Sequence, residues 1–310
     1  MDDFKVQQVK DFLTYLDTIK GMSPRTIKGY KSDLNMFFKF LLCNRKNPTD
    51  IEQITDNFIS NIQLQDLHNF IKYLEVERGN GANARSRKIS SLKSFFEYLQ
   101  RMGRIENNPT INLEMPEIKK ENPTYLTLKQ CQKLLKSISG DFKERDYCII
   151  TLFLNCGLRI SELCNIDIDD IQDDILTITG KGNKQRSIPL NDMCIKSLKN
   201  YLKVRSKDLN KIKDKDALFL SKNYTRISTS GVSNAIKKHM KKARLNPNKY
   251  TPHKLRHTAA TLMLKYGNVD IRSIQEILGH ESVSTTQIYT HVDDDMLRKA
   301  TSSNPLNVEV

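Results

Sequence analysis

The chain has 310 residues, of which 38% are hydrophobic, and a mean hydropathy of −0.54. This composition is typical of a globular protein, and the length suggests two ordinary domains that each bury a core. No apolar run is long enough to span a bilayer, and the acidic start Met1-Asp2-Asp3 lacks the features of a secretion signal. We therefore expect a cytoplasmic protein that does not contact a membrane.

The charge of the chain favours a polyanionic partner. Lysine and arginine total 50 against 36 acidic residues, which gives a formal net charge of +14. A surplus of this size suits DNA, and binding to DNA should weaken steeply with salt. Charge alone supports a generically basic protein about equally well, so motifs must decide between the two interpretations.

Cysteine and histidine spacing argues against metal sites and disulfides. The six cysteines form no C-x-x-C pair, and several lie in apolar helical patterns, which predicts reduced and buried thiols. His253 and His257 have the spacing of a metal-binding helix, but Lys254 stands where the H-E-x-x-H pattern needs glutamate. We expect neither a metal nor a cofactor.

The first third of the chain has the pattern of four helices. Apolar residues recur at helical spacing within Val6–Ile19, Ile27–Leu41, Leu64–Leu74 and Ile89–Leu99. Basic side chains lie off these apolar faces, near the starts of the second and fourth helices: Arg25, Lys28, Lys31, Arg85, Arg87 and Lys88. Such stripes are usually solvated faces, but in a DNA-binding chain they would meet phosphates and the major groove.

A polar stretch with several prolines, residues 109–123, has the composition of a linker. We therefore expect one domain at residues 1–108 and a second at residues 124–310, which would close around a duplex as a clamp. Helical patterns dominate the second part and are interrupted once. There, ILTI, the glycine-rich turn Gly180-Lys181-Gly182-Asn183 and RSIPL predict a β-hairpin with Lys181 in its turn.

Residues 251–292 hold the strongest candidate site. Thr251-Pro252 begins a helix on which His253 and Arg256 share one face. Gly279 ends a following helix, His280 lies just beyond it, and Tyr289 follows nine residues later. Arginine matches phosphate oxygens, imidazole moves protons, and tyrosine is a competent nucleophile toward phosphorus. Each residue alone is more often an ordinary core or surface residue, so the inference depends on their combination.

The string HKLRHTAATLMLKYGNVDIRSIQEILGHESVSTTQIYTHV resembles the signature region of the tyrosine recombinases, the phage integrase family, and particularly of its Xer branch. That family has an H-x-x-R pair, an L-G-H and a tyrosine nine residues beyond this histidine. It also has an arginine in a G-L-R-x-S-E-L box and a lysine in a hairpin. The chain fills all six positions in order, with Arg159, Lys181, His253, Arg256, His280 and Tyr289. Glu162 of the arginine box is expected to orient the site.

The resemblance implies a mainly α fold. It predicts an N-terminal four-helix core-binding domain of the SAM-like type, followed by a mostly helical catalytic domain with a small antiparallel β-sheet. The strings KGMSPRTIKGYKSDLNMFFKFL and ARSRKISSLKSFFEYLQRMGRIENNPT resemble the core-binding domain. We therefore expect its six basic residues to contact DNA. Family members dock a C-terminal tail on a neighbouring protomer, although the tail of this chain departs from the Xer pattern.

The resemblance also implies a mechanism. Tyr289 would attack a DNA phosphodiester, leaving a 3′-phosphotyrosyl enzyme and a free 5′-hydroxyl. Arg159, Arg256 and His280 would stabilise the transition state, while Lys181 would protonate the leaving oxygen and His253 would accept the tyrosine proton. A homo- or hetero-tetramer with a second recombinase would exchange strands at two double-stranded sites through a Holliday junction. A DNA translocase is a further candidate partner.

Several functions stay open at this point. The favoured one is a site-specific recombinase that resolves chromosome dimers, and a mobile-element integrase or DNA invertase of the same family is the alternative. A type IB topoisomerase shares the tyrosine chemistry, but the linker and the core-binding strings favour a recombinase. A non-catalytic DNA-binding protein is the alternative from another class, and the complete set of six residues argues against it.

Overall fold

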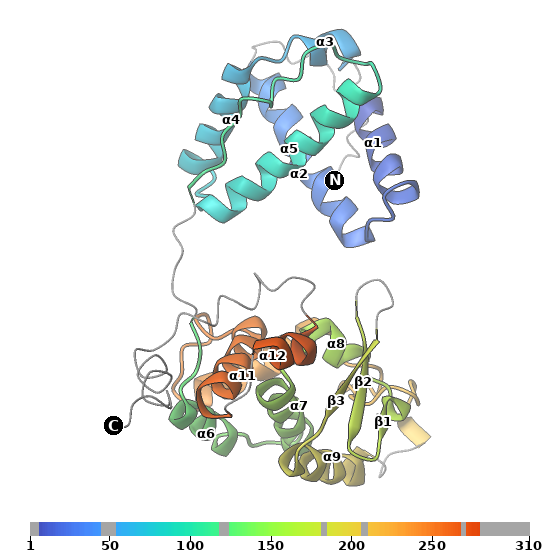
Figure 1. The fold of residues 1–310 in the computed structure, drawn as a ribbon, viewed down its shortest axis with the longest axis vertical. Helices are drawn as coiled ribbons and strands as arrows, with labels where there is room; N and C mark the ends of the chain where they lie inside the picture. Colours follow the sequence, from blue (N-terminus) through green and yellow to red (C-terminus); the bar gives the residue numbers. More distant parts are fainter. Residues whose placement is uncertain are drawn as a thin grey trace, which may run out of the picture. The chain divides into compact units, whose positions relative to one another are not determined.

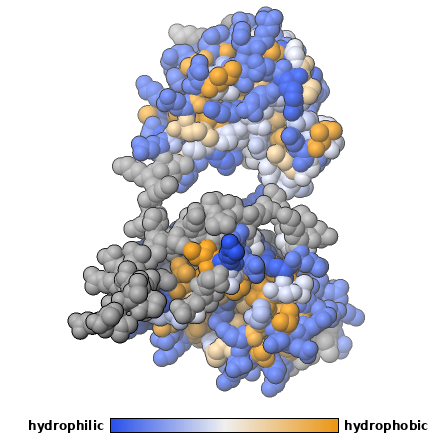
Figure 2. Space-filling model, in the orientation of Figure 1, coloured by the Kyte–Doolittle hydropathy of each residue, from blue (hydrophilic) through white to orange (hydrophobic). Residues whose placement is uncertain are grey.

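The structure is a computed structural model that describes residues 6–44, 54–117, 124–180, 185–205, 210–267 and 271–279. The chain divides into two compact units, Met1–Lys120 and Glu121–Val310 (Figure 1). The division falls within the polar stretch at residues 109–123. On the face that Figure 2 shows, hydrophilic residues dominate both units and hydrophobic residues appear in small scattered patches.

The described part of the first unit is all helical. Its helices are α1 (Gln7–Thr18), α2 (Pro24–Asn44), α3 (Asp56–Ser60), α4 (Leu64–Val76) and α5 (Ala82–Arg101). The periodicity of the sequence predicts all of these except α3, which is too short to show a helical period. The start of α3 has its own local signal, because the Thr55 hydroxyl accepts a hydrogen bond from the Phe58 backbone N–H at 3.2 Å.

Aromatic rings fill the core of the first unit. The fully buried rings come from several of its helices and belong to Phe12, Phe37, Phe38, Phe70, Phe95 and Phe96. Phe37 meets Phe70 edge to face at a centroid distance of 5.1 Å, and Phe38 meets Phe95 in the same way at 5.8 Å. Aromatic pairs prefer this arrangement, so these contacts fix α2 against α4 and α5.

The second unit combines helices with one small sheet. Its elements are α6 (Leu128–Lys136), α7 (Lys143–Cys156), α8 (Ile160–Asn165), η2 (Ile168–Asp170), β1 (Ile171–Gln172), β2 (Ile175–Thr179), β3 (Gln185–Pro189), α9 (Asp192–Arg205), α10 (Thr229–Lys242), α11 (Pro252–Tyr266) and α12 (Ile271–Leu278). The strands are antiparallel in the order β1-β2-β3, with Leu176 opposite Ile188. The prediction of a mainly α fold with a small antiparallel sheet is confirmed. The sequence did not reveal β1, whose two residues are too few to alternate.

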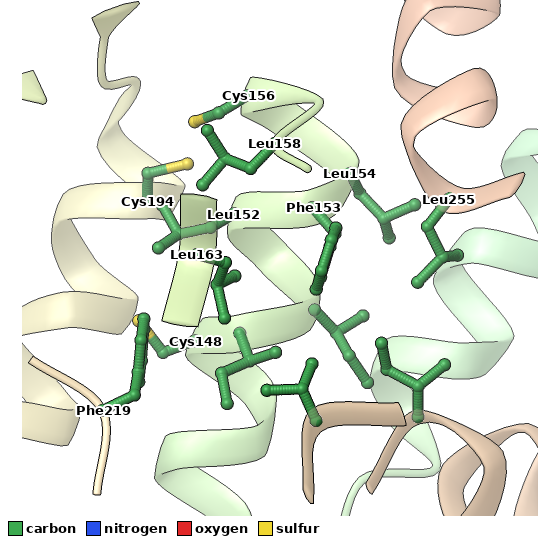
Figure 3. Packing of buried hydrophobic residues seen from close by; sticks show 14 of the residues in the cluster. Cys148, Leu152, Phe153, Leu154, Cys156, Leu158, Leu163, Cys194, Phe219 and Leu255 are labelled. Atoms are coloured by element: carbon green, nitrogen blue, oxygen red, sulfur yellow. The ribbon is translucent and has the colours of Figure 1, made fainter. Parts of the chain in front are cut away.

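Helix α7 forms the centre of the second unit. Its residues are buried on nearly every side from Cys148 to Cys156, as a helix that is apolar all round requires. Figure 3 shows its side chains between Cys194 of α9 and Leu255 of α11. The six cysteines are free and five of them are buried, in agreement with the apolar helical patterns in which several of them lie. Burial raises the pKa of Cys148 to about 12, so this thiol is unreactive.

Gly157 ends α7 with a left-handed φ of +60°. A Cβ atom at this position would lie 2.5 Å from Cδ2 of Leu278, so any other residue would force this buried side chain of α12 to shift. Among the described helices, none has the length and apolar character that crossing a bilayer requires.

We expect Gly157→Ala to lower the free energy of unfolding of the second unit by about 2–4 kcal/mol. About 1–2 kcal/mol would come from left-handed strain and the rest from the clash with Leu278. Urea denaturation with separate probes for the two units would measure the change. The matched control is Gly79→Ala, since Gly79 has the same φ of +60° with nothing within 4 Å of an added Cβ. Equal losses at the two positions would contradict the packing argument.

Candidate active site

One buried carboxylate, that of Glu162, gathers the charged side chains of the site. Its side chain in the first turn of α8 is only 5% exposed. Arg159 donates to it from the backbone N–H at 2.8 Å and from Nη1 at 2.7 Å. Arg186 of β3 donates from Nη1 at 3.1 Å and from Nη2 at 2.8 Å. Arg256 of α11 places Nη1 3.7 Å from Oε2 of Glu162. Three arginines from distant segments therefore meet at one carboxylate.

The arginines keep Glu162 ionised. Burial raises the pKa of this carboxyl group, but the hydrogen bonds from Arg186 and Arg159 and the positive charge of Arg186 outweigh burial and lower the pKa to about 2. The carboxylate is therefore negative at neutral pH. It compensates one of the three guanidinium charges, so the cluster keeps a positive balance that favours an anionic ligand.

The same three arginines hold the C-terminal end of α12. Three consecutive carbonyls accept one hydrogen bond each: Ile277 from Arg186 Nε at 2.9 Å, Leu278 from Arg256 Nη2 at 2.6 Å, and Gly279 from Arg159 Nη2 at 2.9 Å. The last carbonyls of a helix lack partners within it, and its C-terminal end attracts cations. Gly279 has a φ of +63°, which confirms the predicted end of this helix.

The three arginines differ in their exposure to solvent. The side chain of Arg159 is 43% exposed, whereas that of Arg186 is 14% exposed and that of Arg256 is 3% exposed. Arg256 also donates from Nη1 to the Gly157 carbonyl at 2.8 Å, which fixes α11 against the end of α7. Arg159 is thus the arginine of this cluster that an incoming anion reaches most easily.

His253 lies on the first turn of α11, three residues before Arg256. Its Nε2 is 3.0 Å from Nε2 of His257, so one ring donates and the other accepts. Partial burial lowers the pKa of His253, and the positive charges of Arg256, Lys254 and Arg159 lower it further. A lowered pKa keeps the imidazole neutral near pH 7, which is the form that can accept a proton.

Three of the predicted site residues, Lys181, His280 and Tyr289, lie outside the described residues, as does the C-terminal tail. The base of the hairpin that carries Lys181 is described, with Thr179 paired to Gln185. Within the described ranges, no three His, Cys, Asp or Glu side chains gather so that they could hold a metal ion.

The basic residues predicted to contact DNA lie in the first halves of α2 and α5. Arg25 and Lys28 are exposed, and Lys31 is half-buried. The side chain of Arg87 is 54% exposed, and its guanidinium forms a bidentate pair with the buried Asp33, with Nη2 at 2.6 Å from Oδ1. Because α2 and α5 pack together, these basic residues belong to one region of the unit.

Arg85 and Lys88 are engaged within the unit. Arg85 forms an ion pair with Glu75 of α4, and its side chain is 14% exposed. Lys88 is buried, and its Nζ donates to Oδ1 of Asn80 at 2.8 Å. Burial lowers the pKa of Lys88 by more than the negative charge of Asp33 raises it. DNA contact by these two residues stays a prediction.

Sequence reasoning missed Arg186. The sequence did contain a signal for this residue, because Arg186 and Ile188 lie two residues apart in β3 and thus share a face of the strand. Ile188 is buried in the core of the unit. A cation on the buried face of a strand needs an acidic partner or carbonyl acceptors, and Arg186 has both.

Comparison with known proteins agrees with this site. Residues 124–296 match the phage integrase family, and residues 9–103 match the N-terminal SAM-like domain of phage integrases. The chain is 53% identical over 310 residues to the tyrosine recombinase XerC of Caldanaerobacter subterraneus subsp. tengcongensis, an alignment that covers 97% of this chain and 87% of the relative.

Solved structures give the same assignment. The crystal structure of XerA recombinase is 30% identical, with a TM-score of 0.52 over 96% of this chain and 98% of that one. XerH recombinase, in a post-cleavage complex with a palindromic difH substrate, has the same fold at 24% identity, with a TM-score of 0.71 over 97% of this chain and 90% of that one. The chain therefore belongs to the phage integrase family and is a Xer-like tyrosine recombinase, an enzyme that cleaves and rejoins DNA.

Proposed function

We propose that this recombinase exchanges strands between two specific DNA sites through a 3′-phosphotyrosyl intermediate and a Holliday junction. The observation that supports this most directly is the cluster at Glu162, where Arg159 and Arg256 converge from distant segments. Two guanidinium groups beside a neutral histidine suit a phosphodiester whose negative charge grows in the transition state.

Tyr289 is the proposed nucleophile. Its phenolic oxygen attacks the phosphorus, the tyrosyl O–P bond forms, and the bond from phosphorus to the 5′ oxygen breaks. Arg159 and Arg256 donate hydrogen bonds to the non-bridging oxygens, and His280 adds a further one. Each such donor contributes about 3 kcal/mol to the stabilisation of a transition state of this kind.

Two proton transfers complete the step. His253 accepts the proton of Tyr289, a role that its lowered pKa supports. Lys181 gives a proton to the departing 5′ oxygen. The phosphotyrosyl bond retains the energy of the phosphodiester, so the 5′-hydroxyl of a partner strand reverses the step without ATP, metal or cofactor.

The cellular role that we propose is the resolution of chromosome dimers in the cytoplasm, which the similarity to XerC favours over integration or inversion of a mobile element. The chain would act in a tetramer on two sites, with copies of itself or with a sister recombinase. A DNA translocase is a candidate activator.

Synapsis distinguishes recombination from the action of a type IB topoisomerase. A complex that holds two labelled duplexes together would support the recombinase.

A nicked suicide duplex tests the chemistry. We expect the wild-type chain to become covalently joined to the DNA, because the short 5′ fragment diffuses away and rejoining stops. Tyr289→Phe should bind the same duplex without forming an adduct, as gel electrophoresis under denaturing conditions would show. The adduct should also form in EDTA. A wild-type chain that binds DNA but is never trapped would favour a non-catalytic DNA-binding protein.

Arg159 offers a cleaner test of the arginine clamp than Arg256, because it is more exposed and its loss disturbs the core less. We expect Arg159→Met to slow single-turnover cleavage about 100- to 1,000-fold, the cost of losing one transition-state donor. Arg159→Lys should give an intermediate rate, since lysine keeps the positive charge but lacks the planar guanidinium group. A DNA dissociation constant that rises as much as the rate falls would indicate a binding role instead.

Lys28 tests the DNA-binding surface of the first unit. We expect Lys28→Ala to weaken binding uniformly across sequences and to reduce the slope of log K against log salt by about 1, the value for one lost phosphate contact. Lys10→Ala is the control, because Lys10 is an exposed lysine of α1 outside the predicted contacts. Equal slopes for the two variants would show that Lys28 does not meet a phosphate.

A further inference from the structure

Arg186 donates to acceptors of the protein from each nitrogen of its guanidinium group. Its Nη1 and Nη2 bind both oxygens of Glu162, and its Nε donates to the Ile277 carbonyl. The side chain is 14% exposed. All three nitrogens of the guanidinium group therefore hold protein atoms in place, so any effect of the residue on the reaction passes through its neighbours.

The first neighbour is the carboxylate that holds Arg159. Oε1 of Glu162 accepts from both Arg159 Nη1 and Arg186 Nη1. Arg186 thus fixes the carboxylate against which Arg159 is aligned. Without Arg186, Glu162 loses a guanidinium group that holds both of its oxygens, and the direction of the Arg159 guanidinium is less well defined.

The second neighbour is the end of α12. A Cβ atom added at Gly279 would lie 3.1 Å from both Cδ and Nη1 of Arg186, so the backbone at Gly279 packs directly on this side chain. The chain continues from Gly279 to His280 and, nine residues further, to Tyr289. Arg186 therefore fixes the point at which the segment with the proposed nucleophile leaves α12.

The third neighbour is the hairpin to which Arg186 belongs. It lies on β3 one residue after Gln185, which pairs with Thr179 of β2, and Lys181 lies in the connection between these strands. One side chain thus joins the hairpin of the proposed proton donor, the carboxylate of the arginine box, and the helix that precedes the nucleophile.

We propose that Arg186 is a positioning residue for DNA cleavage, which holds Glu162 and the end of α12 where the reaction needs them. This inference rests on the proposed cleavage by Tyr289. Arg186 itself does not touch the scissile phosphate. A lysine cannot replace it fully, because a single ammonium group cannot hold both carboxylate oxygens and the Ile277 carbonyl with the planar geometry of a guanidinium.

Single-turnover cleavage of a nicked suicide duplex tests the inference. We expect Arg186→Met to cleave about 100-fold more slowly than wild type, as misplacement of reacting groups by about 1 Å does, with little change in the DNA dissociation constant. Arg186→Lys should recover part of the rate. The matched control is Arg205→Met, which removes a half-buried arginine whose Nη2 donates to the Lys215 and Ala217 carbonyls, away from the site. Its cleavage rate should equal that of wild type.

The pH profile separates positioning from a general loss of stability. Glu162 faces three charged groups, Arg159, Arg186 and Arg256, and its pKa of about 2 keeps it ionised in wild type. In Arg186→Met, fewer positive charges oppose the effect of burial on Glu162, so the pKa of Glu162 rises. The cleavage rate should then fall as the pH drops through this raised value, an additional acid limb beyond the one that protonation of His253 gives to wild type and Arg205→Met.

The outcomes are distinct. A wild-type adduct together with an unchanged rate and pH profile in Arg186→Met would overturn the inference and leave the proposed function standing. No adduct from wild type would overturn both. Should Arg186→Met fail to fold, Arg186→Lys decides: a rate about tenfold below wild type with an unchanged DNA dissociation constant supports positioning, and a wild-type rate refutes it.

Discussion

The ion cluster at Glu162 is the interaction on which the site depends. A buried carboxylate alone would be costly, and three neighbouring guanidinium groups without it would repel one another. Together they form a network in which the carboxylate is ionised and each arginine has a defined direction. Because acceptors of the protein hold each arginine, the cationic groups have defined positions, which is the condition for electrostatic stabilisation of a transition state.

Helix ends bring this network together. Gly157 turns the chain out of α7 so that Arg159 follows within two residues, and its lack of a side chain admits Leu278 of α12. The end of α12 then presents its last carbonyls to the arginines. The charged cluster and the contact between Gly157 and Leu278 therefore involve the same two helix ends.

Periodicity and motif spacing predicted most of the fold and every member of the described site except Arg186. The long helices carry clear apolar stripes, whereas α3 and β1 are shorter than the period that would reveal them. Arg159, Glu162 and Arg256 belong to local motifs. The ion pair of Arg186 with Glu162, by contrast, joins two segments of the chain whose contact is set only by tertiary packing. The same holds for Arg85, whose partner Glu75 lies on another helix.

The number of donors on a guanidinium explains how Arg159 can combine two tasks. It has five N–H groups, and acceptors in the described part of the chain use one on Nη1 and one on Nη2 of its side chain. The remaining donors can meet a phosphate while Arg159 still holds Glu162 and the end of α12. A lysine in this place would have to exchange one task for the other, because its three donors radiate from a single nitrogen. The exposed arginine therefore has donors left for an anion without dismantling the cluster that orients it.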